Sequence, residues 1–100
     1  MARGVQVDPE RLEVRLLLQR APIGGARVLE IGSGDGRSAR RFARYARSLV
    51  GIDPDTAQIE RAKRRLPAHL HEKVRFEVGD AERLRFKRSA FDVVVFSLSL

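Results

Sequence analysis

Three glycines at every second position follow a short apolar run, and this stretch has the clearest chemical character in the sequence. They are Gly32, Gly34 and Gly36. The run before them predicts a buried strand over about 27–31, with a helix beginning near Arg37. Glycines let the backbone turn sharply and approach a ligand closely, and a helix directs unsatisfied N–H groups toward its own start. The pattern predicts a ligand cradle at the carboxyl end of a strand, the usual site in an open α/β sheet.

The spacing of the glycines bears on which ligand fits. A dinucleotide cradle has the spacing G-x-G-x-x-G, but Arg37 stands where its third glycine would be. Glu30 ends the strand, and its carboxylate would repel a bound phosphate. A cationic ligand that also carries a carboxylate suits the cradle better. A glycine-rich turn without a ligand is the alternative.

A second predicted strand, at about 48–52, ends in Asp53, Pro54 and Asp55. Asp53 lies 23 positions after Glu30, at the place where nucleotide-binding α/β folds hold a ribose diol. One carboxylate can accept hydrogen bonds from both hydroxyls. The alternative is that Asp53 only caps the next helix, with Pro54 at the first helical position. Asp55 is expected to be a helix cap or a solvated acid.

A third predicted strand, at 74–78, also ends in an acid. Gly79 and Asp80 follow it directly. The acid has two interpretations, a ligand-binding side chain or the stabiliser of a turn. Its position after a strand, in step with the first two motifs, favours binding.

The glycine turn and the two strand-end acids resemble the motifs of class I S-adenosylmethionine-dependent methyltransferases. Glu30 and the three glycines match the family's first motif, and Asp53 matches its second-strand acid. The resemblance implies that Asp80 accepts from the adenine amino group, that the backbone of Ala81 contacts the ring, and that Ser97 faces the transferred methyl group. It implies S-adenosylmethionine as cofactor, with S-adenosylhomocysteine as product, and the following cofactor-binding residues: Glu30, Gly32, Ser33, Gly34, Gly36, Asp53, Pro54, Asp80, Ala81 and Ser97.

The resemblance identifies no catalytic residue and no metal ligand. Ser97 departs from the Asn/Asp-Pro-Pro pattern of the enzymes that methylate amino groups of nucleic acids and proteins, and is closer to the small-molecule branch. We therefore expect S-adenosylmethionine-dependent methyl transfer to a small molecule, with this chain as the cofactor-binding half. Two alternatives stay open: a non-catalytic S-adenosylmethionine-binding or interaction module, and an RNA-methylating subunit.

Sequence patterns also predict the elements that position these residues. An acid–proline–acid start at Asp8 predicts a helix over about 9–20, and apolar periodicity predicts two more at about 37–46 and 56–66. With the resemblance, the order of elements implies an α/β Rossmann-like three-layer sandwich. Its parallel sheet is expected to have the order 3-2-1-4, truncated after strand 4, with right-handed crossovers. The whole chain, 1–100, is expected to form this one domain.

The fourth predicted strand, 91–96, carries a continuous β-branched run that predicts burial on both faces. In the family's order, one edge of this strand pairs with strand 1 and the other edge pairs with strand 5. Strand 5 has no counterpart in this sequence. Asp92 is the only charge along it, and an apolar open edge tends to pair with another chain. We expect a homodimer or a partner chain through this strand.

Composition adds weaker constraints. The net charge is +7, and 17 of the 20 basic residues are arginine. An acidic partner such as RNA would explain this, but a biased genome, life at high temperature or solvated helix faces are favoured. The absence of cysteine excludes disulfides and thiolate metal sites, and His69 and His71 are expected at the surface. Without a long apolar run or a signal peptide, a cytoplasmic protein with no membrane partner is expected.

Overall fold

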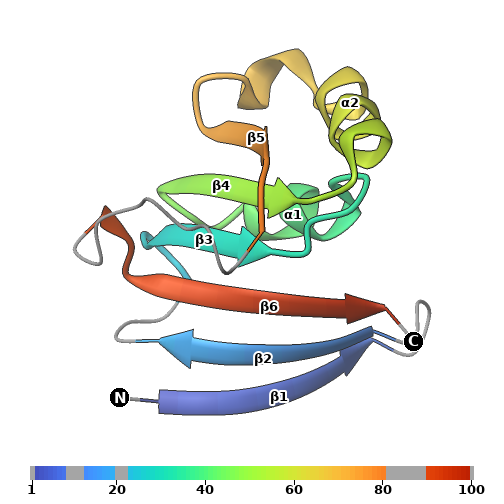
Figure 1. Cartoon of the computed structure of the whole chain (residues 1–100). Helices are drawn as coiled ribbons and strands as arrows, with labels where there is room; N and C mark the ends of the chain where they lie inside the picture. Colours follow the sequence, from blue (N-terminus) through green and yellow to red (C-terminus); the bar gives the residue numbers. More distant parts are fainter. Residues whose placement is uncertain (1, 9–12, 20–22, 81–89, 100) are drawn as a thin grey trace.

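The computed structural model shows a six-stranded sheet with the strand order β1-β2-β6-β3-β4-β5 (Figure 1). The structure describes residues 2–8, 13–19, 23–80 and 90–99. The strands are β1 (Ala2–Asp8), β2 (Glu13–Gln19), β3 (Arg27–Ile31), β4 (Ser48–Asp53), β5 (Val74–Val78) and β6 (Val93–Ser99).

Four of these strands form the predicted parallel sheet. In the order β5-β4-β3-β6 they are the third, second, first and fourth predicted strands, so the Rossmann-like order 3-2-1-4 is confirmed. Leu29 of β3 lies opposite Val50 on one side and Val94 on the other. Val28 and Val93 are fully buried, which agrees with apolar runs covered on both faces.

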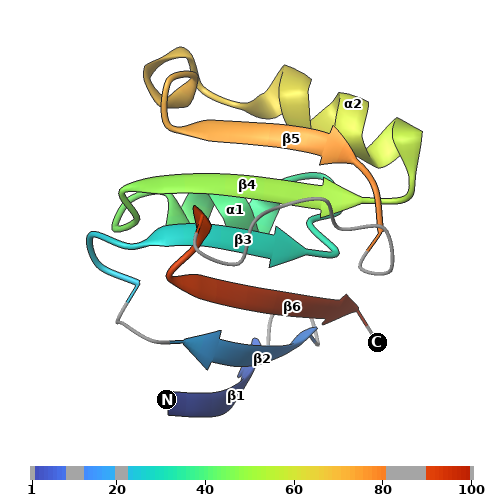
Figure 2. The ribbon, with the colours of Figure 1, turned by 60° about the vertical axis from the view of Figure 1, so that its left-hand side comes forward.

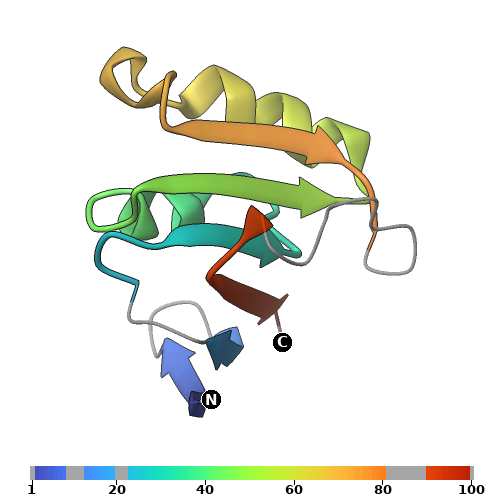
Figure 3. The same cartoon turned by 90° about the vertical axis from the view of Figure 1, so that its left-hand side faces the viewer.

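The helices α1 (Arg37–Phe42) and α2 (Thr56–Arg65) lie on the same face of the sheet (Figure 3). Their small residues face the strands, and Ala39 and Ala62 have no exposed surface. A short 3-10 turn, η1 (Ala68–Leu70), follows α2. α1 is shorter than predicted, because the chain passes into turns after Phe42. The core that joins this layer to the sheet includes Phe42, Leu49, Ile59, Phe76 and Val95.

The prediction of a helix over about 9–20 is wrong for Glu13–Gln19, which form β2. β2 pairs antiparallel with both β1 and β6, and residues 9–12 lie outside the described part. Its leucine run fits a helical stripe and a strand equally well. The register places Leu17 opposite Val95 of β6, so pairing with a neighbouring strand overrides the local preference.

The pairing of β2 also corrects the expectation about the fourth strand. β6 extends over Val93–Ser99 and has β3 on one side and β2 on the other. The open edge that motivated a homodimer or a partner chain through this strand is therefore filled by the chain itself. The terminal strands of the described sheet are β1 and β5.

A charged link joins the starts of β3 and β6. The Arg27 backbone N–H and Nε both donate to Asp92 Oδ2, at 2.9 and 3.2 Å, and Arg27 Nη2 donates to Asp92 Oδ1 at 3.1 Å. The Asp92 N–H donates back to the Arg27 carbonyl at 2.8 Å. These side-chain and backbone hydrogen bonds from Arg27 lower the pKa of Asp92 to about 2. The link therefore favours the ionised carboxylate in the folded chain.

We expect the Asp92 carboxylate to stabilise the fold at mildly acidic and neutral pH, and to lose this effect at strongly acidic pH. An aspartate in an unfolded chain has a pKa of about 3.9, so the link stabilises fully above that pH and is lost as the pH falls toward about 2. Melting temperatures of the wild type and Asp92→Asn, measured between about pH 2 and pH 6, should differ at the upper end and converge at the lower end. A difference that stays constant over this range would contradict the assignment.

Candidate ligand site at the carboxyl edge of the sheet

The glycine turn packs closely against two strands of the sheet, β6 and β5. Gly32 has a positive φ of 84°, and a Cβ there would lie 2.5 Å from the Ser97 carbonyl oxygen of β6. Gly36 also has a positive φ, 83°, and a Cβ would meet the Phe76 ring at 2.8 Å. Larger residues would clash at both positions, since real Cβ contacts are longer. The two glycines thus allow the turn to sit directly on β6 and β5.

Glu30 lies beneath this turn with no exposed surface. The Ser97 hydroxyl, from the neighbouring strand β6, donates to Glu30 Oε2 at 2.5 Å. A carboxylate at this position attracts a positively charged group on a ligand. The structure thus brings together the acid and the serine that the sequence analysis placed in the site.

Asp53, at the end of β4, joins the same group. Its Oδ2 accepts from the Gly34 backbone N–H at 2.9 Å, and its Oδ1 accepts from the Asp55 N–H at 2.9 Å. Asp53 does not cap α2, because that cap is Asp55, which accepts from the N–H groups of Ala57 and Gln58. The cap interpretation of Asp55 is confirmed.

The end of β5 lies next to the end of β4. The Gly79 N–H donates to the Asp53 carbonyl at 3.0 Å, and Asp80, directly after it, is half-buried. Pro54 is exposed beside Asp53. Ala81 lies outside the described residues, so its predicted contact with adenine remains a prediction. Figure 2 shows the carboxyl ends of β3, β4 and β5 at one side of the sheet.

Asp35 is a part of the turn whose role the sequence analysis missed. Its Oδ2 accepts from Arg65 Nη1 of α2 at 2.9 Å, its carbonyl accepts from Arg40 Nη1 at 3.2 Å, and its Oδ1 accepts from the Arg37 N–H at 3.2 Å. Asp35 thereby holds the turn against both helices. The available signal was an acid two residues before an arginine-rich helix, a place where an acid can bind the helix's first N–H groups.

The oxygen atoms at this edge of the sheet fit a ligand that carries a positive charge and hydroxyl groups. The buried Ser33 Oγ has no hydrogen-bond partner among the described residues, and a Cβ at Gly34 would meet only Gln58 Nε2, at 3.9 Å. Open space above Gly34, a buried carboxylate at Glu30 and the acceptor oxygens of Asp53 therefore adjoin one another. This arrangement agrees with the ligand chemistry expected from the sequence.

Other kinds of site find no support in the described part of the chain. Residues 23–80 and 90–97 contain no group of three metal-ligating side chains. No helix among the described residues has the length and apolar character needed to cross a bilayer. A groove of about 530 Å³ lies elsewhere, beside β5 and α2.

Comparison with known proteins identifies the family of the chain. Residues 28–100 match the family model described as a methyltransferase domain. The uncharacterized methyltransferase YcgJ of Bacillus subtilis is 33% identical over 95 residues, covering 94% of this chain and 38% of its own length. The magnesium-protoporphyrin O-methyltransferase of Rhodobacter capsulatus is 39% identical over 67 residues, covering 65% of this chain and 30% of its own length.

A solved structure gives the same result. The S-adenosylmethionine-dependent methyltransferase of Thiobacillus denitrificans, in complex with S-adenosyl-L-homocysteine, is 42% identical with a TM-score of 0.52, over 58% of this chain and 24% of that one. The chain thus spans a quarter to two fifths of the length of these proteins. It belongs to the methyltransferase domain family, whose cofactor is S-adenosylmethionine.

Proposed function

We propose that this chain is the cofactor-binding half of a methyltransferase that acts on a small molecule. One observation supports the proposal above the others: the Asp53 carboxylate accepts from the Gly34 N–H at 2.9 Å. The acid after the second strand of the parallel sheet and the glycine turn after the first therefore lie at one place. This is the place at which α/β folds of this order hold a nucleoside.

Each acid has a part in binding that follows from its position. Asp53 accepts one backbone N–H on each oxygen and keeps a further lone pair on each for the two ribose hydroxyls. Buried Glu30 attracts the ammonium group of the cofactor's amino-acid end. Asp80, at the end of β5, accepts from the adenine amino group, next to the backbone of Ala81. Ser97, at the end of β6, adjoins the transferred methyl group.

The chain contributes to transfer mainly by positioning. When bound, the cofactor supplies a methyl group on a positively charged sulfur. The glycine turn and Asp53 fix the cofactor's orientation, and Glu30 with Ser97 fixes its reactive end relative to β6. Holding two reactants in line converts a bimolecular step into an effectively unimolecular one, and this is the contribution proposed for the chain.

A small-molecule acceptor has support from the relatives. The Rhodobacter capsulatus relative is named for magnesium-protoporphyrin, and this chain spans 30% of its length. We assign the acceptor pocket to the remaining parts of such proteins. Ser97 in place of an Asn/Asp-Pro-Pro pattern agrees with a small acceptor.

Two other candidate functions have distinct signatures. A non-catalytic binding module would bind S-adenosylmethionine without transferring its methyl group to any acceptor. An RNA-methylating subunit would use the exposed arginines of α1, such as Arg37 and Arg41, and its RNA affinity would fall steeply with salt. Single-stranded RNA is read mainly by stacking on aromatic side chains. In the described part of the two helices and their flanking turns, Tyr45 is the one exposed residue among phenylalanine, tyrosine and tryptophan, so the small molecule is favoured.

S-adenosylhomocysteine should raise the melting temperature of the chain, and NADH should not. A ligand that binds only the folded state stabilises it by an amount that grows with the ratio of its concentration to its Kd, and Glu30 repels the pyrophosphate of a dinucleotide. Thermal unfolding with each ligand at equal concentration tests this. A larger shift with NADH would overturn the assignment.

Replacement of Asp53 should weaken cofactor binding, whereas replacement of Asp55 should weaken only the fold. Asp53→Ala removes two charge-assisted bonds to ribose, and we expect a loss of about 2–4 kcal/mol in S-adenosylhomocysteine affinity by isothermal titration. Asp55→Ala is the matched control, because it removes the α2 cap at a cost of about 1 kcal/mol in unfolding free energy and leaves affinity unchanged. If both variants keep wild-type affinity, Asp53 does not hold the ribose.

A further inference from the structure

The outer edge of β5 has backbone groups that no described strand uses. On its inner side, the Lys73 carbonyl accepts from the Leu49 N–H at 2.9 Å, and the Gly79 N–H donates to the Asp53 carbonyl at 3.0 Å. The backbone N–H and C=O groups of the odd-numbered residues of β5 therefore point toward β4. Because backbone groups alternate in direction along a strand, the N–H and C=O groups of the three even-numbered residues face outward. These residues are Val74, Phe76 and Val78.

A groove of about 530 Å³ follows this edge. Its apolar part comes from Leu66, Val74 and Phe76, and Arg75 and Glu77 of β5 also line it. Val78, at the end of the strand, is a large apolar residue that is 53% exposed. An extended strand laid along β5 would cover the groove and satisfy the outward backbone groups.

We propose that β5 pairs with β5 of a second copy of this chain, antiparallel about a two-fold axis, with Phe76 opposite the partner's Phe76. In this register the outward-facing residues oppose one another, Val74 against the partner's Val78. They become the hydrogen-bonded pairs of the new ladder. The two sheets then join into one, and every outward N–H and C=O group of Val74–Val78 has a counterpart.

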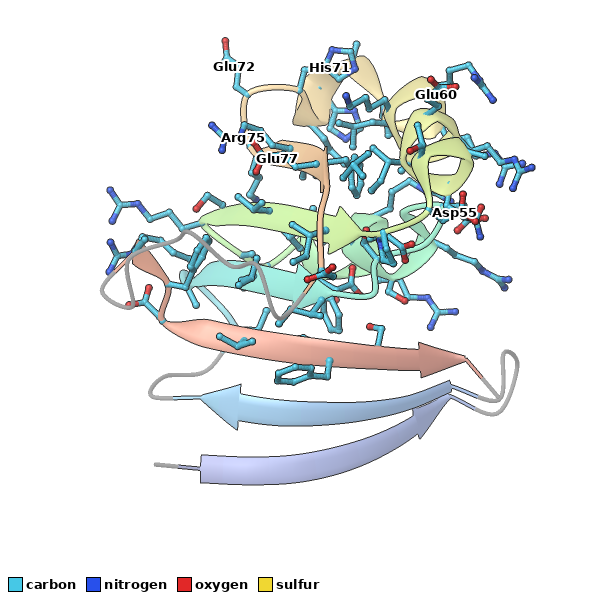
Figure 4. All side chains as sticks on the ribbon, in the orientation of Figure 1. Asp55, Glu60, His71, Glu72, Arg75 and Glu77 are labelled. Atoms are coloured by element: carbon cyan, nitrogen blue, oxygen red, sulfur yellow. The ribbon has the colours of Figure 1, made fainter. Side chains whose placement is uncertain are left out.

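The charges of β5 select this register. Arg75 Nη2 lies 3.6 Å from Glu77 Oε1, and both side chains are exposed, at 67% and 45%. Figure 4 shows them projecting together from β5, on the side away from α2. In the proposed register each Arg75 faces the partner's Glu77, a favourable cross-strand pair. A shift by two residues in either direction would place Arg75 against the partner's Arg75, or Glu77 against the partner's Glu77.

The apolar residues agree with the same register. Val78 lies opposite the partner's Val74, one of the apolar residues of the groove. Association thus covers an exposed valine with the groove of the other copy, and the reverse holds by symmetry. A strand of unrelated sequence would lack both the charge match and this fit, so a second copy of the chain is the occupant favoured by the observations.

Charge exchange tests the register. Sedimentation equilibrium of the wild type should show a reversible dimer, and Arg75→Glu and Glu77→Arg should each raise its dissociation constant at least about tenfold, because two attractive pairs become repulsive. The double variant Arg75→Glu/Glu77→Arg should restore association to within about threefold, since the opposed charges are again opposite in sign. Both side chains are exposed, so unchanged circular dichroism is expected for all three.

Covalent capture gives a second readout, which traps the dimer even where removal of the two charges has weakened it. The chain has no cysteine, so Arg75→Cys/Glu77→Cys should form disulfide-linked dimers on mild oxidation, because directly opposed residues come within bonding range. Each single variant serves as the control and should cross-link far less. A monomer throughout the accessible concentrations, or a dimer that the single charge variants leave unchanged, would overturn the proposal. So would a heterologous protein strand that binds this edge while the chain itself stays monomeric.

Discussion

The contact between the glycine turn and the end of β6 is the constraint on which the rest of the site depends. The Ser97 carbonyl occupies the space where a side chain at Gly32 would be, and the Ser97 hydroxyl donates to Glu30. A buried carboxylate is costly unless it is hydrogen-bonded, so β6 must lie beside β3 for Glu30 to stay beneath the turn. The position of Glu30 in the candidate site therefore depends on the sheet order β4-β3-β6.

The other contacts of the site extend from that junction. Asp53 holds the turn from β4, and Asp35 holds it against α2 through Arg65. Gly36 and Gly51 admit the Phe76 ring, which would lie within 3 Å of a Cβ at either position. The turn thus rests on three strands and two helices before any ligand is bound. On the proposed function, the cofactor would bind with little reorganisation of the turn, and such preorganisation favours catalysis by positioning.

Much of this arrangement could be predicted from the sequence, because short-range signals determine it. The glycine spacing, the strand-end acids and the Asp55 cap all act over a few residues, and the parallel order follows from chirality and short connections. The strand β2 could not be predicted in this way, since its leucine run is consistent with a helix until β6 is beside it. The Glu30–Ser97 and Asp35–Arg65 contacts join residues 67 and 30 positions apart. Only the folded chain brings them together.

The most direct test of this account is the affinity of S-adenosylhomocysteine for Glu30→Gln. The substitution keeps the shape of the side chain and removes its charge, so the fold should be as stable as that of the wild type or more so. If the buried carboxylate binds the ligand's ammonium group, the dissociation constant measured by isothermal titration should rise about 10- to 100-fold, the value of one charge-assisted bond. An unchanged dissociation constant in a folded Glu30→Gln chain would contradict the account.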